Sequence, residues 1–171
     1  MPGLFVLFGA AFLLVLSFKF QPARKFDKDS LAGLPGVGLI IEPVPDLEHS
    51  DGLNETELRE EIERRFREAG VGILSKDDLR QAPGYPLLDV SVQAHEIPGQ
   101  DRVCAFSVAV EVQQIVTLQR SADAEAFSTT WSSRSFGSVT TDGLGALQGN
   151  VLDHIDHFIN DWLSVNPKQE S

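Results

Sequence analysis

The chain has 171 residues, of which 42% are hydrophobic and 23% charged, a composition typical of a folded globular protein rather than a disordered one. Residues 1–28 hold four cations and one anion, so the remaining 10 lysines and arginines against 24 acidic residues leave residues 29–171 near −14. Because a domain this acidic repels phosphate backbones, we expect no nucleic-acid partner. The single cysteine, Cys104, excludes an internal disulfide and a multi-cysteine zinc site.

The first predicted element is an apolar run, Leu4–Phe18, whose 15 residues suit a signal-peptide core or a short membrane anchor. No Ala-x-Ala cleavage site follows the run, and no cysteine stands at its end for lipidation. We therefore predict a signal peptide or membrane anchor over residues 1–20, a tether over 21–35, a single α/β domain over 36–167 and a tail over 168–171.

The charges beside the apolar run bear on its orientation. Lys19, Arg24 and Lys25 follow the run, and no lysine or arginine precedes it. The positive-inside rule applied to these cations favours a domain that faces the cytoplasm, whereas the family resemblance described below favours export. We predict an inner-membrane anchor with the domain facing the periplasm, and we retain two alternatives, a cytoplasm-facing domain and a domain secreted after cleavage.

The first half of the domain is predicted to alternate short strands with helices. The apolar run Val37–Val44 indicates the first strand. Asn54 is a good N-cap and Gly70 a typical C-terminal stop, so a helix is predicted between them, with its charged side in solvent. A second short strand over Val71–Leu74 and one or two helical turns within Ser75–Gln81 follow.

Alternation with period two marks the central strands. Leu88–His95 alternates in this way, and the turn Pro98–Asp101 joins it to the next strand as an antiparallel hairpin. In Val103–Gln119, nearly every second residue from Cys104 is apolar, so one face of this long strand is predicted to be buried. Two amides at Gln113–Gln114 interrupt the pattern and predict a bend or bulge there.

The last strand is predicted over Phe127–Val139. Phe127, Thr129 and Trp131 alternate along it and are placed on one face. The strand is rich in serine and threonine, which favours a position at the edge of the sheet.

A final amphipathic helix starts around Leu144 and ends before Pro167. The predicted fold class is therefore α/β (α+β), with one mixed, mainly antiparallel sheet and two amphipathic helices on one face. The predicted core includes Leu58, Ile62, Phe66, Phe106, Val108, Val110, Ile155, Phe158 and Trp162.

The candidate chemical site is a polar cluster on the final helix. His154, His157 and Asp161 share one flank at spacings i, i+3 and i+7, which can hold a divalent ion through two imidazoles and a carboxylate. A plain polar helix flank is the other interpretation, and we favour it because no second ligand set is evident. Neither a nucleophile motif nor a phosphate loop accompanies the cluster, so we expect no cofactor and no catalysis.

Several stretches of the sequence together carry a family resemblance: LREEIERRFREAGVGIL, PLLDVSVQAHEI, AFSVAVEVQQIVTL, TTWSSRSFGSV and HIDHFINDWLSVNP. Over roughly residues 35–167 the chain resembles small exported bacterial proteins of unknown function. Its element order is similar to that of the LPS-assembly lipoprotein LptE and the N-terminal domain of TolB. The resemblance implies a sheet with helices on one face and a role in binding partners within the envelope. The chain departs from the lipoproteins by lacking a lipidated cysteine, and no functional residue is carried over.

These observations predict a non-catalytic interaction module, tethered to the membrane by its N-terminal segment, with an unknown envelope protein as its partner. The predicted edge strand can accept a strand from that partner through backbone hydrogen bonds. Two alternatives stay open. The edge can be shielded by the chain itself, or the protein can be a metal-binding or enzymatic domain that uses the His154, His157 and Asp161 flank.

Overall fold

The computed structural model describes residues 25–42 and 53–167. The apolar run Leu4–Phe18, predicted as a signal peptide or anchor, and the predicted tail over 168–171 lie outside the described residues. Within the described ranges, no helix combines the length and the apolar character needed to cross a bilayer.

Four strands form one mixed sheet in the order β1 (Gly38–Ile41), β2 (Leu87–Glu96), β3 (Val103–Leu118) and β4 (Ser121–Thr140). β1 pairs with β2 in parallel, and the two other pairings are antiparallel. The α+β fold with a mixed, mainly antiparallel sheet is therefore confirmed.

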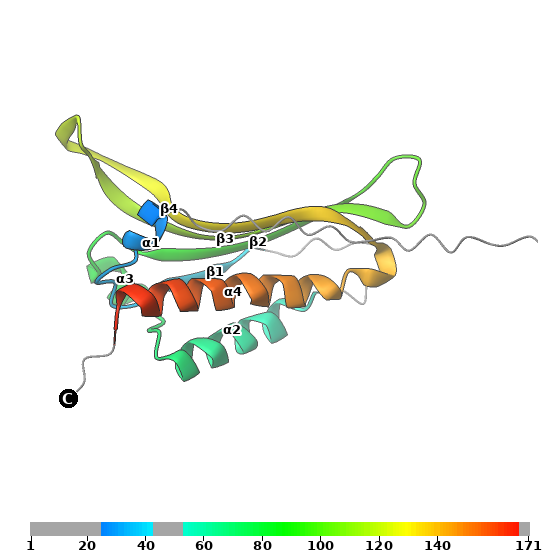
Figure 1. Cartoon of the computed structure of the whole chain (residues 1–171), viewed down its shortest axis with the longest axis horizontal. Helices are drawn as coiled ribbons and strands as arrows, with labels where there is room; N and C mark the ends of the chain where they lie inside the picture. The colour runs from blue at the N-terminus through cyan, green and yellow to red at the C-terminus, as the bar shows by residue number, and fades with distance from the viewer. Residues whose placement is uncertain (1–24, 43–52, 168–171) are drawn as a thin grey trace, which may run out of the picture.

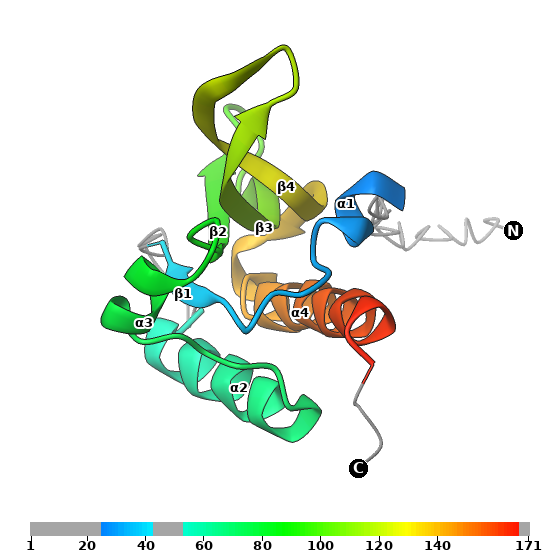
Figure 2. The ribbon, with the colours of Figure 1, turned by 90° about the vertical axis from the view of Figure 1, so that its left-hand side faces the viewer.

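Two long helices, α2 (Glu55–Ala69) and α4 (Ala146–Val165), lie on the same face of this sheet (Figure 1). In Figure 2, α4 lies beneath β3 and β4, and α2 lies next to α4 on the side of β1. Two short helices, α1 (Lys25–Asp29) and α3 (Lys76–Gln81), flank the sheet, and a 3-10 turn over Thr141–Gly143 joins β4 to α4. Among the described elements, none covers the opposite face, which we call the open face.

The caps of α2 are those that the sequence predicts. The Asn54 side-chain oxygen accepts hydrogen bonds from the backbone N–H groups of Thr56 (2.9 Å) and Glu57 (3.3 Å). Gly70 ends the helix with φ of 78°, a left-handed conformation that favours glycine.

The core lies between the sheet and the two long helices, where stacked aromatic rings contribute to it. Phe66 of α2 stacks on Phe158 of α4 with ring centroids 5.6 Å apart, and Trp131 of β4 meets Phe158 edge to face at 5.3 Å. Every predicted core residue is buried except Trp162, which is only partly buried at the margin of the core.

A bulge in β4 corrects one prediction. Val112 pairs with Trp131 and Gln113 pairs with Thr129, so Thr130 is an extra residue without a partner on β3. The bulge coincides with the bend predicted at Gln113–Gln114. Because one added residue reverses the alternation, Trp131 is fully buried under the sheet while Phe127 is 52% exposed on the open face. The prediction that Phe127, Thr129 and Trp131 share a face was therefore wrong.

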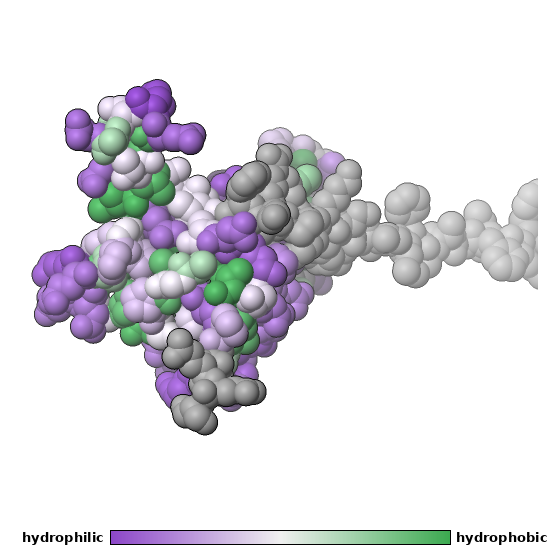
Figure 3. Space-filling view, turned by 60° about the vertical axis from the view of Figure 1, so that its left-hand side comes forward, coloured by the Kyte–Doolittle hydropathy of each residue, from purple (hydrophilic) through white to green (hydrophobic). Residues whose placement is uncertain are grey.

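Beyond the bulge, β3 and β4 continue as a two-stranded hairpin, which we call the arm. The arm projects away from the helices at the upper left of Figure 1. In Figure 3, apolar side chains gather between its polar tip and the body of the protein. β4 thus begins at Ser121, six residues before the predicted start, because turn and strand residues at the arm tip remain paired.

Residues 25–35 of the segment predicted as a tether pack onto the domain. α1 contacts α4 and β4, and Leu31 is completely buried. Asn166 at the end of α4 holds this segment: its Nδ2 donates to the Leu31 carbonyl (2.9 Å) and its Oδ1 accepts from the Gly33 N–H (2.7 Å). The domain therefore includes residues that glycine and proline content alone assigns to a linker.

The short strand predicted over Val71–Leu74 is reduced to one isolated bridge between Val37 and Ile73. Val71 is buried while Ile73 is 40% exposed. Two backbone hydrogen bonds hold this stretch to Val37, from the Val37 N–H to the Gly72 carbonyl (3.0 Å) and from the Leu74 N–H to the Val37 carbonyl (2.9 Å).

We predict that Leu31→Ala lowers the free energy of unfolding by about 3 kcal/mol, because it removes a fully buried side chain and leaves a cavity. Urea unfolding followed by tryptophan fluorescence measures the effect. Ile40→Ala, which shortens a side chain that is 46% exposed, is the control and should change stability by less than about 1 kcal/mol. Equal small effects of both substitutions would contradict the packing of residues 25–35 on the domain.

Candidate binding surface

The outer edge of β4 is the most extended unpaired backbone in the described structure. β4 pairs with β3 only, and no other described strand lies beyond it. The prediction of an edge position for this strand is thus confirmed.

Hydrogen-bond geometry shows which residues of β4 face outward. The Thr141 N–H donates to the Arg102 carbonyl on the β3 side (3.0 Å). Because residues of an antiparallel pair alternate between bonded and non-bonded positions, the odd-numbered residues of β4 after the bulge bond to β3. The even-numbered residues direct their N–H and C=O groups away from the sheet: Ser132, Arg134, Phe136, Ser138 and Thr140.

The hydrogen bonds between β3 and β2 agree with this assignment. The Ile97 N–H donates to the Val103 carbonyl at 2.9 Å, so the odd-numbered residues of β3 face β2 and the even-numbered ones face β4. No backbone hydrogen bond from another described segment reaches the outward groups from Ser132 to Ser138, and the Thr140 carbonyl begins the 3-10 turn as its N-cap. We call this stretch, Ser132–Thr140, the free edge.

The free edge ends at the bulge, where α1 approaches β4. The Ser30 hydroxyl is shared between the carbonyl oxygens of Asp27 (2.5 Å) and Thr130 (3.2 Å). Gln114 Nε2 donates to the Thr130 hydroxyl (2.6 Å) and to the Ser30 carbonyl (3.3 Å). Among the described residues, Ser30 and α1 therefore shield the edge at Thr130, and none shields it from Ser132 onward. α1 is seen beside this end of β4 in Figure 2.

The opposite edge of the sheet is poorly suited to pairing. β1 has only four residues, Gly38–Ile41, and the sequence continues with Pro43 and Pro45, which lack an N–H group. The free edge of β4 is longer, contains no proline and carries one charged side chain, Arg134.

The open face beside the free edge combines exposed apolar side chains with an acidic row. Phe136 is 62% exposed, the largest exposed fraction among the large hydrophobic side chains described. Arg134 forms an ion pair with Glu111 on β3. Burial, and then the neighbouring charges of Glu42 and Glu111, raise the pKa of Asp89 on β2.

The sequence-predicted site residues face the sheet rather than a shared cavity. His154 is almost completely buried between α4 and β4. Its Nδ1 lies 2.7 Å from the Ser133 hydroxyl, and its Nε2 lies 3.0 Å from the Ser135 hydroxyl. Ser135 donates in turn to the Asn150 side-chain oxygen at 2.5 Å. Because Ser135 gives its hydrogen to Asn150, it accepts from His154 Nε2–H, and the Ser133 hydroxyl donates to the unprotonated Nδ1.

His157 and Asp161 lie next to each other one turn further along α4. His157 Nε2 is 3.6 Å from Asp161 Oδ2, and the same oxygen accepts a hydrogen bond from the Trp131 indole N–H (3.0 Å). The structure therefore brings this pair together and directs His154 to the serines. In the part of the chain that the structure describes, no group of three or more His, Cys, Asp or Glu side chains is arranged to hold a metal ion.

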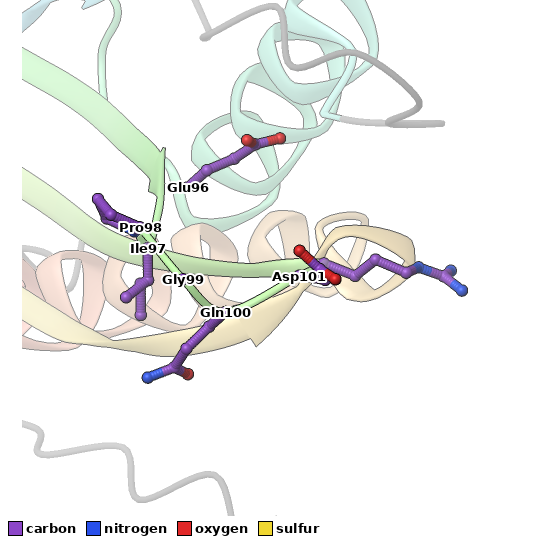
Figure 4. Close-up of a pocket in the computed structure, with 7 residues that line it drawn as sticks. Glu96, Ile97, Pro98, Gly99, Gln100 and Asp101 are labelled. Carbon is purple, nitrogen blue, oxygen red and sulfur yellow. The ribbon is translucent and has the colours of Figure 1, made fainter.

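A hollow at the β2–β3 turn is lined by residues 96–102 (Figure 4). The side chains of Glu96 and Gln100 extend to opposite sides of the turn. Since they do not converge on a common point, this hollow is the inside of a turn rather than a ligand site.

Sequence reasoning missed the roles of Ser133 and Ser135. Both occupy the buried face of β4, where a hydroxyl needs a partner, and His154 supplies it. The sequence does contain a signal for their burial, because the two serines follow Trp131 at every second position and so share its face of the strand. This signal can be interpreted only once Trp131 is known to point into the core.

We predict that His154 makes stability depend on pH. Burial lowers the pKa of His154 from 6.5 to about 4, with Asp153 opposing and His157 reinforcing this shift. Between these two pH values the unfolded chain binds more protons than the folded one, so stability is complete above pH 6.5 and falls as the pH drops toward 4. The loss from this group is about 3 kcal/mol.

Urea unfolding of the wild type and of His154→Gln at several pH values tests this prediction. The carboxylate contributions are common to both proteins, so the stability difference between them should shrink by about 3 kcal/mol from pH 7 to pH 4. His95→Gln, which makes the same replacement at an exposed position on β2, is the control for the chemistry of the substitution. A stability difference that is constant over this range would show that His154 does not titrate as proposed.

Comparison of the chain with protein-family models, with curated proteins and with solved structures finds no match. The resemblance to small exported bacterial proteins and the similarity in element order to LptE and TolB stay predictions. The candidate binding surface, composed of the free edge and the adjoining open face, therefore follows from the geometry of this chain alone.

Proposed function

We propose that the protein is a non-catalytic interaction module of the bacterial cell envelope that binds an extended protein segment along the free edge. The observation that carries this proposal is the run of outward backbone groups from Ser132 to Ser138, for which no backbone partner is found among the described residues. A strand added there would extend the sheet by backbone hydrogen bonds.

The sequence of the free edge supports strand addition. Exposed edges are usually protected by proline, lysine, a bulge or a covering element. Among the described residues, the bulge and α1 protect the end at Thr130, and the nine residues of the free edge contain neither proline nor lysine. Phe136 and Arg134 stand on the open face beside the edge, where they would contact alternate side chains of an added strand.

The environment of the titratable groups supports a binding rather than a catalytic role. His154 is neutral near pH 7 and is bonded to two serines inside the domain. Asp161 accepts from the buried Trp131 indole. These side chains stabilise the contact between α4 and β4, and this packing role supports the non-catalytic proposal.

The envelope location rests on the N-terminal sequence. Leu4–Phe18 is apolar, and only residues 19–24 separate it from α1. Because α1 packs beside Thr130, membrane insertion of the apolar run would hold the free edge near the bilayer surface. We propose an inner-membrane anchor and a domain that faces the periplasm.

We predict that a photoreactive amino acid at Ser132 captures protein in intact cells through the free edge. Ser138→Pro in the same chain should abolish these adducts, because proline removes an outward N–H while leaving the bonds to β3 intact. Ser138→Ala is the matched control and should retain them. Gel mobility and mass spectrometry of the adducts give the readout.

A photoreactive residue at Glu60, on the exposed side of α2, controls for random collision. Adducts at equal yield from Glu60 and Ser132, or no protein adduct from the edge at all, would contradict the proposed function. Equal unfolding midpoints of the Ser138 variants confirm that the proline acts on the edge and not on folding.

Membrane orientation has a separate test. We predict that alkaline phosphatase fused after Ser171 is active, because this enzyme matures only outside the cytoplasm, while a cytoplasmic reporter at the same position is inactive. The reverse result would assign the domain to the cytoplasmic side. Deleting residues 4–18 should abolish phosphatase activity if this run directs export.

A further inference from the structure

We infer that the free edge binds the free edge of a second copy of this chain, with the two β4 strands antiparallel about a twofold axis at Phe136. The inference rests on the proposed function, because it names the strand that the edge accepts. A symmetric dimer of this kind uses the same surface on both copies.

The two ends of the free edge determine the register. At one end, Ser30 and α1 occupy the edge at Thr130. At the other end, the Thr141 N–H turns back to Arg102 and β4 passes into a 3-10 turn. The stretch left between these limits is Ser132–Thr140, whose midpoint is Phe136.

The direction of the backbone hydrogen-bonding groups agrees with a twofold axis at Phe136. Phe136 directs both backbone groups outward, so it can exchange two hydrogen bonds with Phe136 of the second copy. Ser132 then pairs with Thr140 and Arg134 with Ser138 of the second copy, which gives about eight hydrogen bonds when the Thr140 carbonyls stay in the 3-10 turn. A register shifted by two residues loses one bonded pair, and an odd shift places outward groups against inward ones.

The side chain at this centre is the one that most needs a partner. Phe136 is 62% exposed on the open face, and no described element covers it. Directly opposed aromatic residues on neighbouring antiparallel strands pack against each other and stabilise the pairing. The centre defined by the ends of the edge and the most exposed aromatic side chain are thus the same residue.

The charge distribution permits this contact in an acidic protein. The chain has a net charge of −11, which opposes self-association elsewhere on the surface. The free edge contains no acidic residue, and its one charged residue, Arg134, already forms an ion pair with Glu111. In the inferred register Arg134 faces Ser138 of the second copy, so like charges are not opposed.

Cysteine crosslinking of the full chain in mild detergent tests the register. Bonded residues of an antiparallel pair have Cα atoms about 5.5 Å apart, within the range of a disulfide. Phe136→Cys should therefore give a covalent dimer under mild oxidation. Ser132→Cys should not, because its two copies would be about 27 Å apart along the strands. The native Cys104 is fully buried and does not compete.

A mixture of Arg134→Cys and Ser138→Cys chains provides a further check, since these residues face each other only in this register. Covalent dimers should form in the mixture at several times the yield of either variant alone. Light scattering of the unmodified chain should show a dimer that Ser138→Pro converts to a monomer while the unfolding midpoint is retained.

Equal crosslinking at residues 132 and 136, or a monomeric wild type with no Phe136→Cys dimer, would overturn the inference. The results that would refute the proposed function differ from those that would refute the self-pairing. Photoadducts at Ser132 that contain a different protein would sustain the module while refuting the self-pairing, and the absence of any protein adduct would refute both.

Discussion

A single extra residue in β4 governs how the rest of the molecule is arranged. Thr130 is not paired with any residue in the β3–β4 register. Its side-chain hydroxyl donates to the Val112 carbonyl (3.3 Å) and accepts a hydrogen bond from the Gln114 amide. The bulge reverses the alternation of β4, so Trp131 enters the core and Phe127 leaves it. It also marks where the arm departs from the body and where Ser30 reaches the edge. One local irregularity therefore sets the core composition, the arm and the limit of the free edge.

The polar side chains that suggest chemistry serve the packing of α4 against β4. Ser133 and Ser135 bring hydroxyl groups onto the buried face of a strand, and burying them without partners would be unfavourable. His154 satisfies both, and the Trp131 indole finds Asp161. Such a network orients the helix on the sheet more specifically than apolar contacts alone, because each hydrogen bond forms only when its donor and acceptor are aligned.

The two edges of the sheet differ in a way that is relevant to binding. β1 is short and is followed in sequence by prolines, whereas the free edge of β4 is regular, lacks acidic residues and contains the exposed Phe136. In a chain with a net charge of −11, a nearly uncharged edge is the part of the surface where another strand can approach with the least repulsion. No described element covers the open face either, but its acidic row at Asp89 and Glu111 makes it less suited to a second acidic chain.

Patterns with a fixed period were sufficient to predict most elements of this fold. The alternation along β3, the Asn54 and Gly70 caps of α2 and the apolar stripe of α4 each depend on local backbone geometry, and all three are confirmed. The edge position of β4 also followed from its composition.

Tertiary structure decided what periodicity cannot specify. An extra residue in a strand changes which side chains point inward, so the faces of Phe127 and Trp131 depended on pairing with β3. Leu31 lies in a stretch with the composition of a linker, yet it is buried because α4 and β4 provide a site for it. The free edge is likewise a property of the folded chain. Its limits depend on which backbone groups β3 and Ser30 have already satisfied, and only the three-dimensional arrangement determines that.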